Sequence, residues 1–261
     1  MLCLIGSVSG VTQLNGVVYI VCSPRIFSFN ATTHEQLESI KVKYMSKYSS
    51  DIVACEITSQ LYVTDEYCVW RVSPDGADIR RWLPKSSTDT LTPWSLSVRS
   101  GRLLVTSSKA NELTQFDADG EELRRVQLPG DMMPHHAVES PTGTFIVSCW
   151  NGELEEHQVI EVNTGGQVLR QFTLSTGGWH RSRFTHYIAV DSHGNIIVVD
   201  SLFNCSALVL DARLTLRRVI IDEHQLNYEY PRRLCFVEES GQLLVAGERC
   251  VGLRVFGVLR P

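Results

Sequence analysis

Long apolar runs and an excess of positive charge are both missing from the 261-residue sequence. No stretch approaches the roughly 18 consecutive apolar residues of a membrane-spanning helix, which argues against an integral membrane protein. Lysine and arginine number 24 against 29 aspartate and glutamate residues, so the formal net charge is −5. This balance disfavours a strongly basic nucleic-acid-binding protein, although it permits a local basic surface.

Motifs for several site chemistries are also missing. The eight cysteines include no C-x-x-C pair and form no Cys/His array, so these residues contain no RING finger or B-box. There is no heptad run for a coiled coil and no G-x-S-x-G turn of a serine hydrolase. Residues 1–5 are apolar but too short, and lack the basic flank, for a secretory signal. We therefore expect buried, reduced thiols in a cytoplasmic protein.

The sequence does contain a short β-rich motif that occurs six times. The copies occupy residues 15–22, 59–65, 100–107, 142–149, 193–200 and 240–247. Their turn glycine, replaced by Gln60 in the second copy, stands at positions 16, 60, 101, 143, 194 and 241. The intervals all lie in the forties or at 51, and a period of this length is typical of a propeller blade.

Each copy is flanked by further strand patterns. An apolar strand precedes the glycine, as in residues 94–98, and a third strand ends at a turn such as Asp119-Gly120, which supplies the positive φ of a tight hairpin. A fourth segment, such as residues 216–220, alternates apolar and basic residues, which indicates an edge strand with one wet face. Four strands in six copies predict an all-β chain: one domain over residues 1–261, folded as a six-bladed β-propeller of four-stranded antiparallel blades.

The last copy lacks a clear fourth strand, because the sequence ends soon after its third strand at residues 251–258. The apolar residues 1–5 have no other assignment in the repeat. We expect them to supply the missing strand and so to close the ring with strands from both chain ends.

The fifth copy carries the most specific motif. Residues 187–201 read Tyr-Ile-Ala-Val-Asp-Ser-His-Gly-Asn-Ile-Ile-Val-Val-Asp-Ser, and Asn204 and Leu-Val-Leu-Asp at 208–211 follow. This segment resembles the NHL repeat, whose pattern is I-A-V-D-x-x-G-N-I-Y-V-A-D followed by N-H-R-I and V-F-D. The third and fourth copies are similar but looser, and the N-H-R-I part is degenerate here. NHL propellers commonly form the C-terminal module of tripartite-motif proteins, so the resemblance implies that one face binds protein or RNA.

The loops that enter blades four to six are rich in aromatic, histidine and arginine residues. Rings give large rigid contact area and arginine adds forked hydrogen bonds, a combination that suits a binding surface. We therefore predict a non-catalytic recognition module that binds a protein or peptide through this loop face, as a monomer and without a cofactor. The predicted ligand-binding residues are Trp94, His135, His136, Trp150, Trp179, His180, Arg181, Arg183, Tyr230, Arg232 and Arg233.

RNA and a metal ion are the two alternative ligands for the same loops. RNA would suit the rings and cations of residues 179–184, but Asp131, Asp222 and Glu229 in the same loops would repel phosphate. A metal ion would need three or four converging ligands, and alignment of the Ala-Val phrases places Tyr187, not a histidine, opposite His135. No metal site is predicted.

The remaining alternative is an enzyme resembling the lactonase-type or strictosidine-synthase-type propellers, which place a calcium ion or an acid–base group in the central channel. Asp65 and Asp200 are the carboxylates that close second strands, and Glu56 and Asp191 are the acids that would join them. These carboxylates are too few for a convincing calcium cage, so we expect them to cap backbone amides instead. The sequence alone therefore predicts no enzyme.

Overall fold

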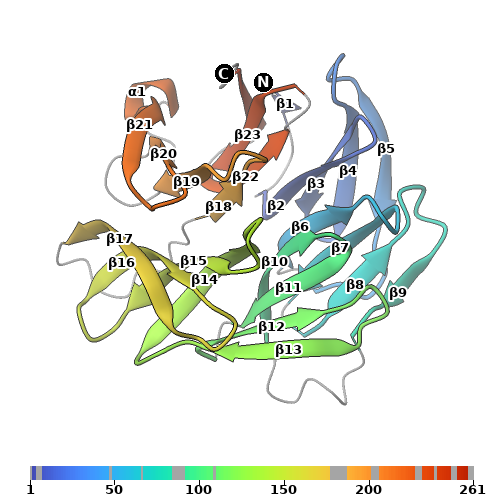
Figure 1. Cartoon of the computed structure of the whole chain (residues 1–261). Helices are drawn as coiled ribbons and strands as arrows, with labels where there is room; N and C mark the ends of the chain where they lie inside the picture. Colours follow the sequence, from blue (N-terminus) through green and yellow to red (C-terminus); the bar gives the residue numbers. More distant parts are fainter. Residues whose placement is uncertain are drawn as a thin grey trace.

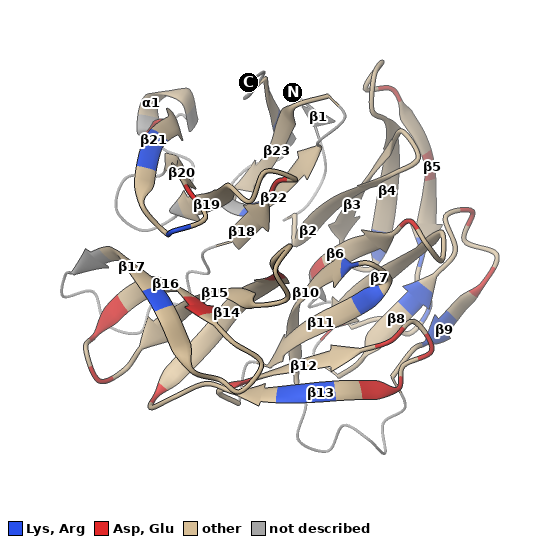
Figure 2. Ribbon diagram, in the orientation of Figure 1, with Lys and Arg blue, Asp and Glu red and all other residues tan. Residues whose placement is uncertain are grey.

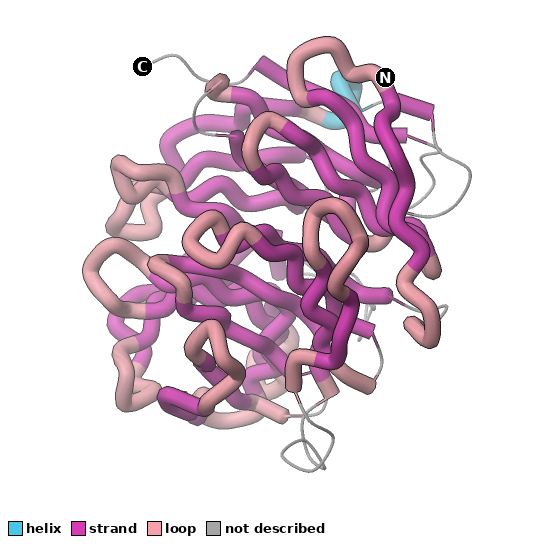
Figure 3. Tube along the Cα trace, turned by 90° about the vertical axis from the view of Figure 1, so that its right-hand side faces the viewer, coloured by secondary structure: helices cyan, strands magenta, loops and turns pink. Residues whose placement is uncertain are grey.

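The chain folds into six four-stranded antiparallel sheets arranged around a central axis, as the computed structural model shows (Figure 1). The structure describes residues 2–3, 8–46, 49–65, 67–83, 92–107, 110–176, 187–200, 206–226, 231–237, 240–247 and 252–257. Strands dominate these residues, and a four-residue helix, α1 (Glu223–Leu226), follows the fifth blade (Figure 3). The predicted six-bladed β-propeller is confirmed. No helix in the described part of the chain is long and apolar enough to cross a membrane.

Within each of the first five blades the strands run in sequence order from the central channel to the periphery. Blade one consists of β2 (Gly10–Leu14), β3 (Val17–Cys22), β4 (Arg25–Asn30) and β5 (Gln36–Lys41). Blade two consists of β6 (Ser49–Cys55), β7 (Gln60–Asp65), β8 (Val69–Val72) and β9 (Ile79–Arg81). Blade three consists of β10 (Pro93–Arg99), β11 (Arg102–Ser107), β12 (Glu112–Phe116) and β13 (Glu122–Gln127). Blade four consists of β14 (Met132–Glu139), β15 (Phe145–Asn151), β16 (Glu156–Val162) and β17 (Val168–Thr176). Blade five consists of β18 (Tyr187–Val190), β19 (Ile196–Asp200), β20 (Ser206–Leu210) and β21 (Leu216–Ile221).

The sixth blade is built from both ends of the chain, as predicted. It consists of β22 (Pro231–Val237), β23 (Gln242–Gly247), β24 (Gly252–Gly257) and β1 (Leu2–Cys3), and β1 pairs antiparallel with β24 at Leu2↔Leu253 and Cys3↔Gly252. Figure 1 accordingly places both chain ends beside this blade. The pairing closes the ring by backbone hydrogen bonds and leaves no gap between the first and last blades.

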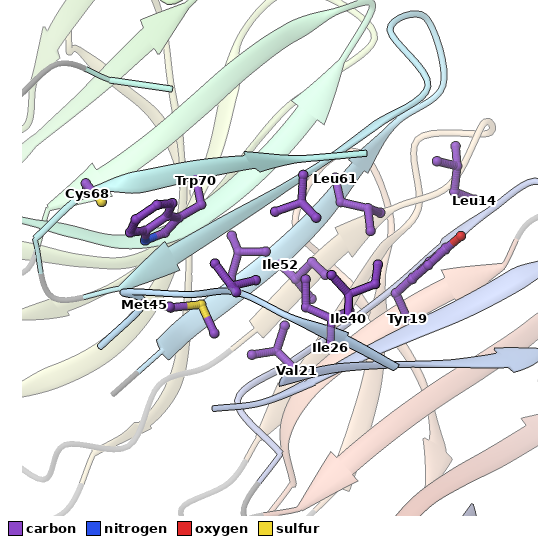
Figure 4. Close-up of a cluster of buried hydrophobic side chains, with 13 residues drawn as sticks. Leu14, Tyr19, Val21, Ile26, Ile40, Met45, Ile52, Leu61, Cys68 and Trp70 are labelled. Carbon is purple, nitrogen blue, oxygen red and sulfur yellow. The ribbon is translucent and has the colours of Figure 1, made fainter. Parts of the chain in front are cut away.

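The core lies between neighbouring blades rather than within one sheet. A buried cluster joins β3 and β4 of blade one to β6, β7 and β8 of blade two, with Ile26, Ile52 and Leu61 at its centre (Figure 4). Between blades two and three, the Trp82 ring meets Tyr62 and Phe116 edge to face, with ring centroids 5.0 and 5.7 Å apart. Each such side chain contributes about 1.5–3 kcal/mol by its burial, so the blades stabilise one another around the ring.

The outermost strands are more exposed to solvent than predicted. We expected an alternation with one exposed face, but in β13 only Val126 is buried, and in β21 the four residues from Leu216 are all exposed. Charged residues concentrate on such peripheral strands, among them β9, β13 and β21 (Figure 2). The charge that protects these edges from pairing with other chains therefore covers both of their faces.

Candidate functional site

Six residues from six different blades share one level of the central channel. Each innermost strand pairs with its second strand, and the pairings Gly10↔Val21, Asp51↔Thr64, Ser95↔Thr106, His136↔Ser148, Tyr187↔Val199 and Arg233↔Ala246 involve equivalent positions of the repeat. We call Gly10, Asp51, Ser95, His136, Tyr187 and Arg233 the channel ring. In blades two, three, four and six a β-bulge immediately precedes this position, and such bulges re-aim the following side chain.

Asp51 is the carboxylate of the channel ring and is only 3 % exposed. Its Oδ1 accepts the Ile52 N–H at 2.9 Å, and its Oδ2 accepts the Leu96 N–H of the next blade at 2.8 Å. Burial raises the pKa of Asp51 to about 6, although the nearby Arg233 and Tyr187 groups and these N–H donors oppose the rise. An ionised carboxylate has about four acceptor sites, so two sites remain after the backbone bonds.

His136 is 5 % exposed and neutral. Its Nε2 lies 3.2 Å from the Leu96 carbonyl oxygen, which can only accept, so Nε2 carries the proton. Its Nδ1 in turn accepts the Ile188 N–H at 3.5 Å. Burial lowers the pKa of His136 to about 3, and the nearby Arg233 cation acts in the same direction. Both ring nitrogens are thus used to tie blade four to blades three and five.

Tyr187 and Arg233 complete the charged part of the ring. The Arg233 guanidinium carbon lies 4.1 Å from the Tyr187 ring centroid, and the same ring lies 4.4 Å from that of His136. Arg233 Nε donates to the Ser9 carbonyl at the entrance to blade one. Burial raises the pKa of Tyr187 well above its ordinary value, and the Asp51 charge adds to this rise. The phenol is therefore neutral and able to donate.

These contacts run almost entirely around the channel, from blade two through blades three, four, five and six to blade one. The remaining step is made by the Thr12 hydroxyl, which accepts the Ala54 N–H at 3.1 Å, and by the absence of a side chain at Gly10. A Cβ at Gly10 would lie 2.7 Å from the Ile52 nitrogen. Glycine at this ring position allows the innermost strands of blades one and two to lie close together. The channel ring therefore holds the blades together in addition to forming a polar cluster.

A cavity of about 230 Å³ occupies the channel and is lined by residues of all six innermost strands. Asp51, His136 and Tyr187 lie at one end, where the lining residues are buried. Toward the opposite end, formed by residues such as Arg99, Glu139 and Phe236, the lining residues become half-exposed. The cavity therefore opens at the carboxyl ends of the innermost strands, on the face opposite the loops that were predicted to bind.

The predicted binding residues divide into three groups. Trp179, His180, Arg181, Arg183 and Tyr230 lie outside the described residues, as does the side chain of Arg232 in the bulge of β22. His136 and Arg233 are buried in the channel ring rather than on a loop surface. Trp94, His135 and Trp150 are half-buried, close to the starts of β10 and β14 and to the end of β15.

Two of these predicted residues come together in blade four. Trp150 lies 4.7 Å from the ring of His157, and His135 stacks on the same ring at 5.8 Å. Met133 pairs with Trp150 across the strands and is 51 % exposed. Sequence reasoning missed His157 because it lies on the third strand, where the repeat gives no sign that it faces the first.

Sequence reasoning also missed Asp51 and Tyr187. The Ala-Val alignment was wrong by one residue, because it matched Ala137 with Ala189, whereas the strand pairing matches Ala137 with Ile188. Tyr187 therefore lies at the level of His136, not His135. Counting back from the turn glycine through the hairpin gives the correct register, so the signal was present in the sequence.

The carboxylates that were weighed for a calcium site do not fit one. Asp65 accepts the N–H groups of Ser46, Tyr67 and Cys68 and the Trp70 indole N–H. Asp191 is similarly occupied by the N–H groups of His193 and Asn195 and by the Asn195 side-chain amide. Glu56 is exposed, and the side chain of Asp200 is not described. The expected capping role is confirmed at Asp65 and Asp191, and in the described part of the chain no three His, Cys, Asp or Glu side chains gather as metal ligands.

Comparison with known proteins gives structural likeness only. No family model and no curated protein matches the sequence, so the NHL resemblance remains a prediction. A gluconolactonase from Xanthomonas campestris superposes with a TM-score of 0.71 at 12% identity, covering 97% of this chain and 86% of its own. A streptogramin B lyase gives 0.64 at 10% identity, with 93% and 91% covered. The WD40 propeller domain of Doa1 gives 0.62 at 14% identity, with 97% and 94% covered.

At these identities the likeness establishes the propeller fold, and the named reactions belong to those proteins. It nevertheless corrects one prediction. We expected no enzyme, but two of these structural neighbours are named as enzymes. The expectation rested on the scarcity of calcium ligands, and it did not identify Asp51 as a candidate acid–base group in the channel.

Proposed function

We propose that this propeller is an enzyme that acts on a small molecule in its central channel, with Asp51 as the acid–base group. The observation that carries the proposal is the position of Asp51 at the buried end of the cavity, beside Tyr187. A buried carboxyl whose pKa is raised to about 6 can both take and return a proton near neutral pH, which is what general acid–base catalysis requires.

The reaction class that we propose first is the opening of a lactone or ester. The Asp51 carboxylate takes a proton from a water molecule as the water oxygen bonds to the carbonyl carbon. The bond between that carbon and the ring oxygen then breaks, and the leaving oxygen receives the proton back from Asp51. The neutral Tyr187 hydroxyl beside the carboxylate has one proton to donate, and it would turn this donor from Asp51 to the developing negative charge. His136 has both nitrogens on backbone groups and serves as a positioning residue.

Two further observations support this choice. The cavity walls beyond the ring include the apolar side chains of Val98, Val138 and Val190, which favour the binding of a small organic molecule. In addition, a gluconolactonase and a lyase share the fold. The substrates of those proteins are not carried over.

Proton release in a weakly buffered indicator assay tests the proposal, with δ-valerolactone, glucono-δ-lactone and phenyl acetate as probes. We expect turnover of at least one probe and a rate that rises as pH increases through about 6, because the base must be ionised. Asp51→Asn should lower the rate at least 100-fold, while Asp211→Asn, in a turn at the end of β20 far from the cavity lining, keeps it. Full activity in a folded Asp51→Asn variant, or no turnover of any probe by the wild type, would overturn the proposal.

A second candidate function is recognition of a protein partner at the loop face, which the NHL resemblance implies. It is favoured by the cluster of Met133, Trp150, His135 and His157 in blade four, where an exposed methionine adjoins aromatic rings. Trp150→Ala should weaken a captured partner by at least tenfold if this cluster is an anchor, with exposed Leu123→Ala as the control. Equal capture by both variants would reject the cluster, and a steep salt dependence would identify RNA instead.

A further inference from the structure

Arg99 stands apart from the other charged groups that line the cavity. It is the last residue of β10, and its half-exposed side chain lies at the open end of the channel. Among the described residues it makes no hydrogen bond or ion pair, whereas the neighbouring acid is already occupied. Glu139 receives Arg102 through two nitrogens, at 2.6 and 3.2 Å, and the Gln115 amide at 2.7 Å.

Among the described residues that line this end of the cavity, the charge balance is therefore positive. Glu139 and Arg102 neutralise one another, and the other acid of the lining, Asp51, lies at the buried end beside Arg233. Val98, Val138 and Phe236 also line the cavity, from blades three, four and six. A cation beside apolar surface is less screened than one in open solvent, so it attracts an anion more strongly.

We infer that the channel ligand carries an anionic group, a carboxylate or a phosphate, which Arg99 binds at the cavity mouth. This inference rests on the proposed function for the identity of the reacting end, which would lie at Asp51. A guanidinium offers a planar fork of donors that fits both anions through paired hydrogen bonds. The ligand would thus be oriented with its charge outward and its reacting group inward.

The dimensions restrict the size of this ligand. Arg99 lies four residues along β10 from Ser95 at the level of the channel ring, which corresponds to about 13 Å along an extended strand. The cavity volume of about 230 Å³ lies below the roughly 300–1,000 Å³ of pockets for drug-sized ligands. A slender chain with one anionic end fits both limits better than a nucleotide or a peptide.

Calorimetric titration of matched probes tests this inference separately from catalysis. Gluconate and glucitol have the same six-carbon hydroxylated chain, but only gluconate has a carboxylate, and inorganic phosphate represents the other anion. We expect gluconate or phosphate to bind the wild type at least tenfold more tightly than glucitol. Arg99→Gln should abolish that preference, Arg99→Lys should retain part of it, and Arg213→Gln, on an exposed turn of blade five, should retain all of it.

The outcomes distinguish the two proposals. If Arg99→Gln loses the anion preference while Asp51→Asn retains it, the inference holds whether or not the chain catalyses lactone opening. If anions and glucitol bind the wild type equally, or if no anion binds at 50 mM, or if Arg99→Gln behaves as the wild type, the inference is wrong. In those cases an Asp51-dependent rate with a neutral lactone would still support the proposed function.

Discussion

The cost of keeping Asp51 ionised inside the channel can be measured from the pH dependence of stability. Burial raises the pKa of Asp51 from its ordinary value of 3.8 to about 6. A raised carboxyl pKa means that the folded state binds this proton more tightly than the unfolded state does. The resulting stability is fully present below pH 3.8 and is lost as pH rises through about 6. Because one pKa unit corresponds to about 1.4 kcal/mol, the loss amounts to about 3 kcal/mol.

The Asp51→Asn variant isolates this contribution. Asparagine lacks the charge, but its amide nitrogen cannot accept one of the two N–H groups of Ile52 and Leu96, which adds a cost that does not depend on pH. The absolute stability of the variant is therefore uninformative, whereas its pH dependence relative to the wild type is decisive. Relative to the wild type, we expect the free energy of unfolding of the variant to rise by about 2 kcal/mol between pH 4 and pH 7.5, because the unfolded carboxyl is already more than half ionised at pH 4. His136 and all other groups cancel in this difference.

Urea unfolding followed by tryptophan fluorescence at pH 4, 5, 6, 7 and 7.5 provides the measurement. Asp211→Asn is the matched control, because the backbone N–H groups of Thr215 and Arg213 lower the pKa of this turn aspartate. Its stability contribution is present at neutral pH and lost in acid, so the control difference should slope in the opposite direction. A flat difference for Asp51→Asn would refute the reasoning, since it would mean that Arg233 and the N–H donors fully offset the burial.

Three further predictions concern the ring of blades. Deleting residues 2–6 removes β1 and should lower the melting temperature in a thermal scan; an unchanged melt would show that ring closure needs no pairing with β24. Gly10→Ala places a Cβ 2.7 Å from the Ile52 nitrogen and should cost about 1–3 kcal/mol of unfolding free energy, while Gly16→Ala, with open space around it, tests the turn alone. Burial lowers the pKa of His136 to about 3, so the stability of the wild type falls as pH drops below 6.5. The His136→Asn variant does not lose this stability, so its stability deficit relative to the wild type should shrink by about 3 kcal/mol from pH 7.5 to pH 4. A deficit that stays constant with pH in urea titrations would contradict this.

The fold was predictable because the information for it is repeated. The second strand of each blade buries apolar side chains at the same alternate positions, as in Leu61 and Val63 of β7 and Leu103 and Val105 of β11. Each copy therefore confirms the others, and one aberrant turn, such as that at Gln60, does not obscure the period. Ring closure by β1 followed from the one missing strand. The exposure of both faces of the outer strands was not predictable, since it depends on how little the neighbouring blade covers.

The candidate site was hidden by the same repetition. A propeller repeats its backbone, but the channel ring requires a different side chain from each blade: no side chain at Gly10, an acid at Asp51, an imidazole at His136, and a phenol and a cation at Tyr187 and Arg233. These positions weaken the repeat rather than strengthen it, and bulges before four of them shift any alignment based on the flanking apolar residues. Once the register is fixed at the hairpin turns, the departures from the repeat become the signal. For a closed ring of blades, the channel positions at which the copies disagree are therefore where chemistry is to be sought.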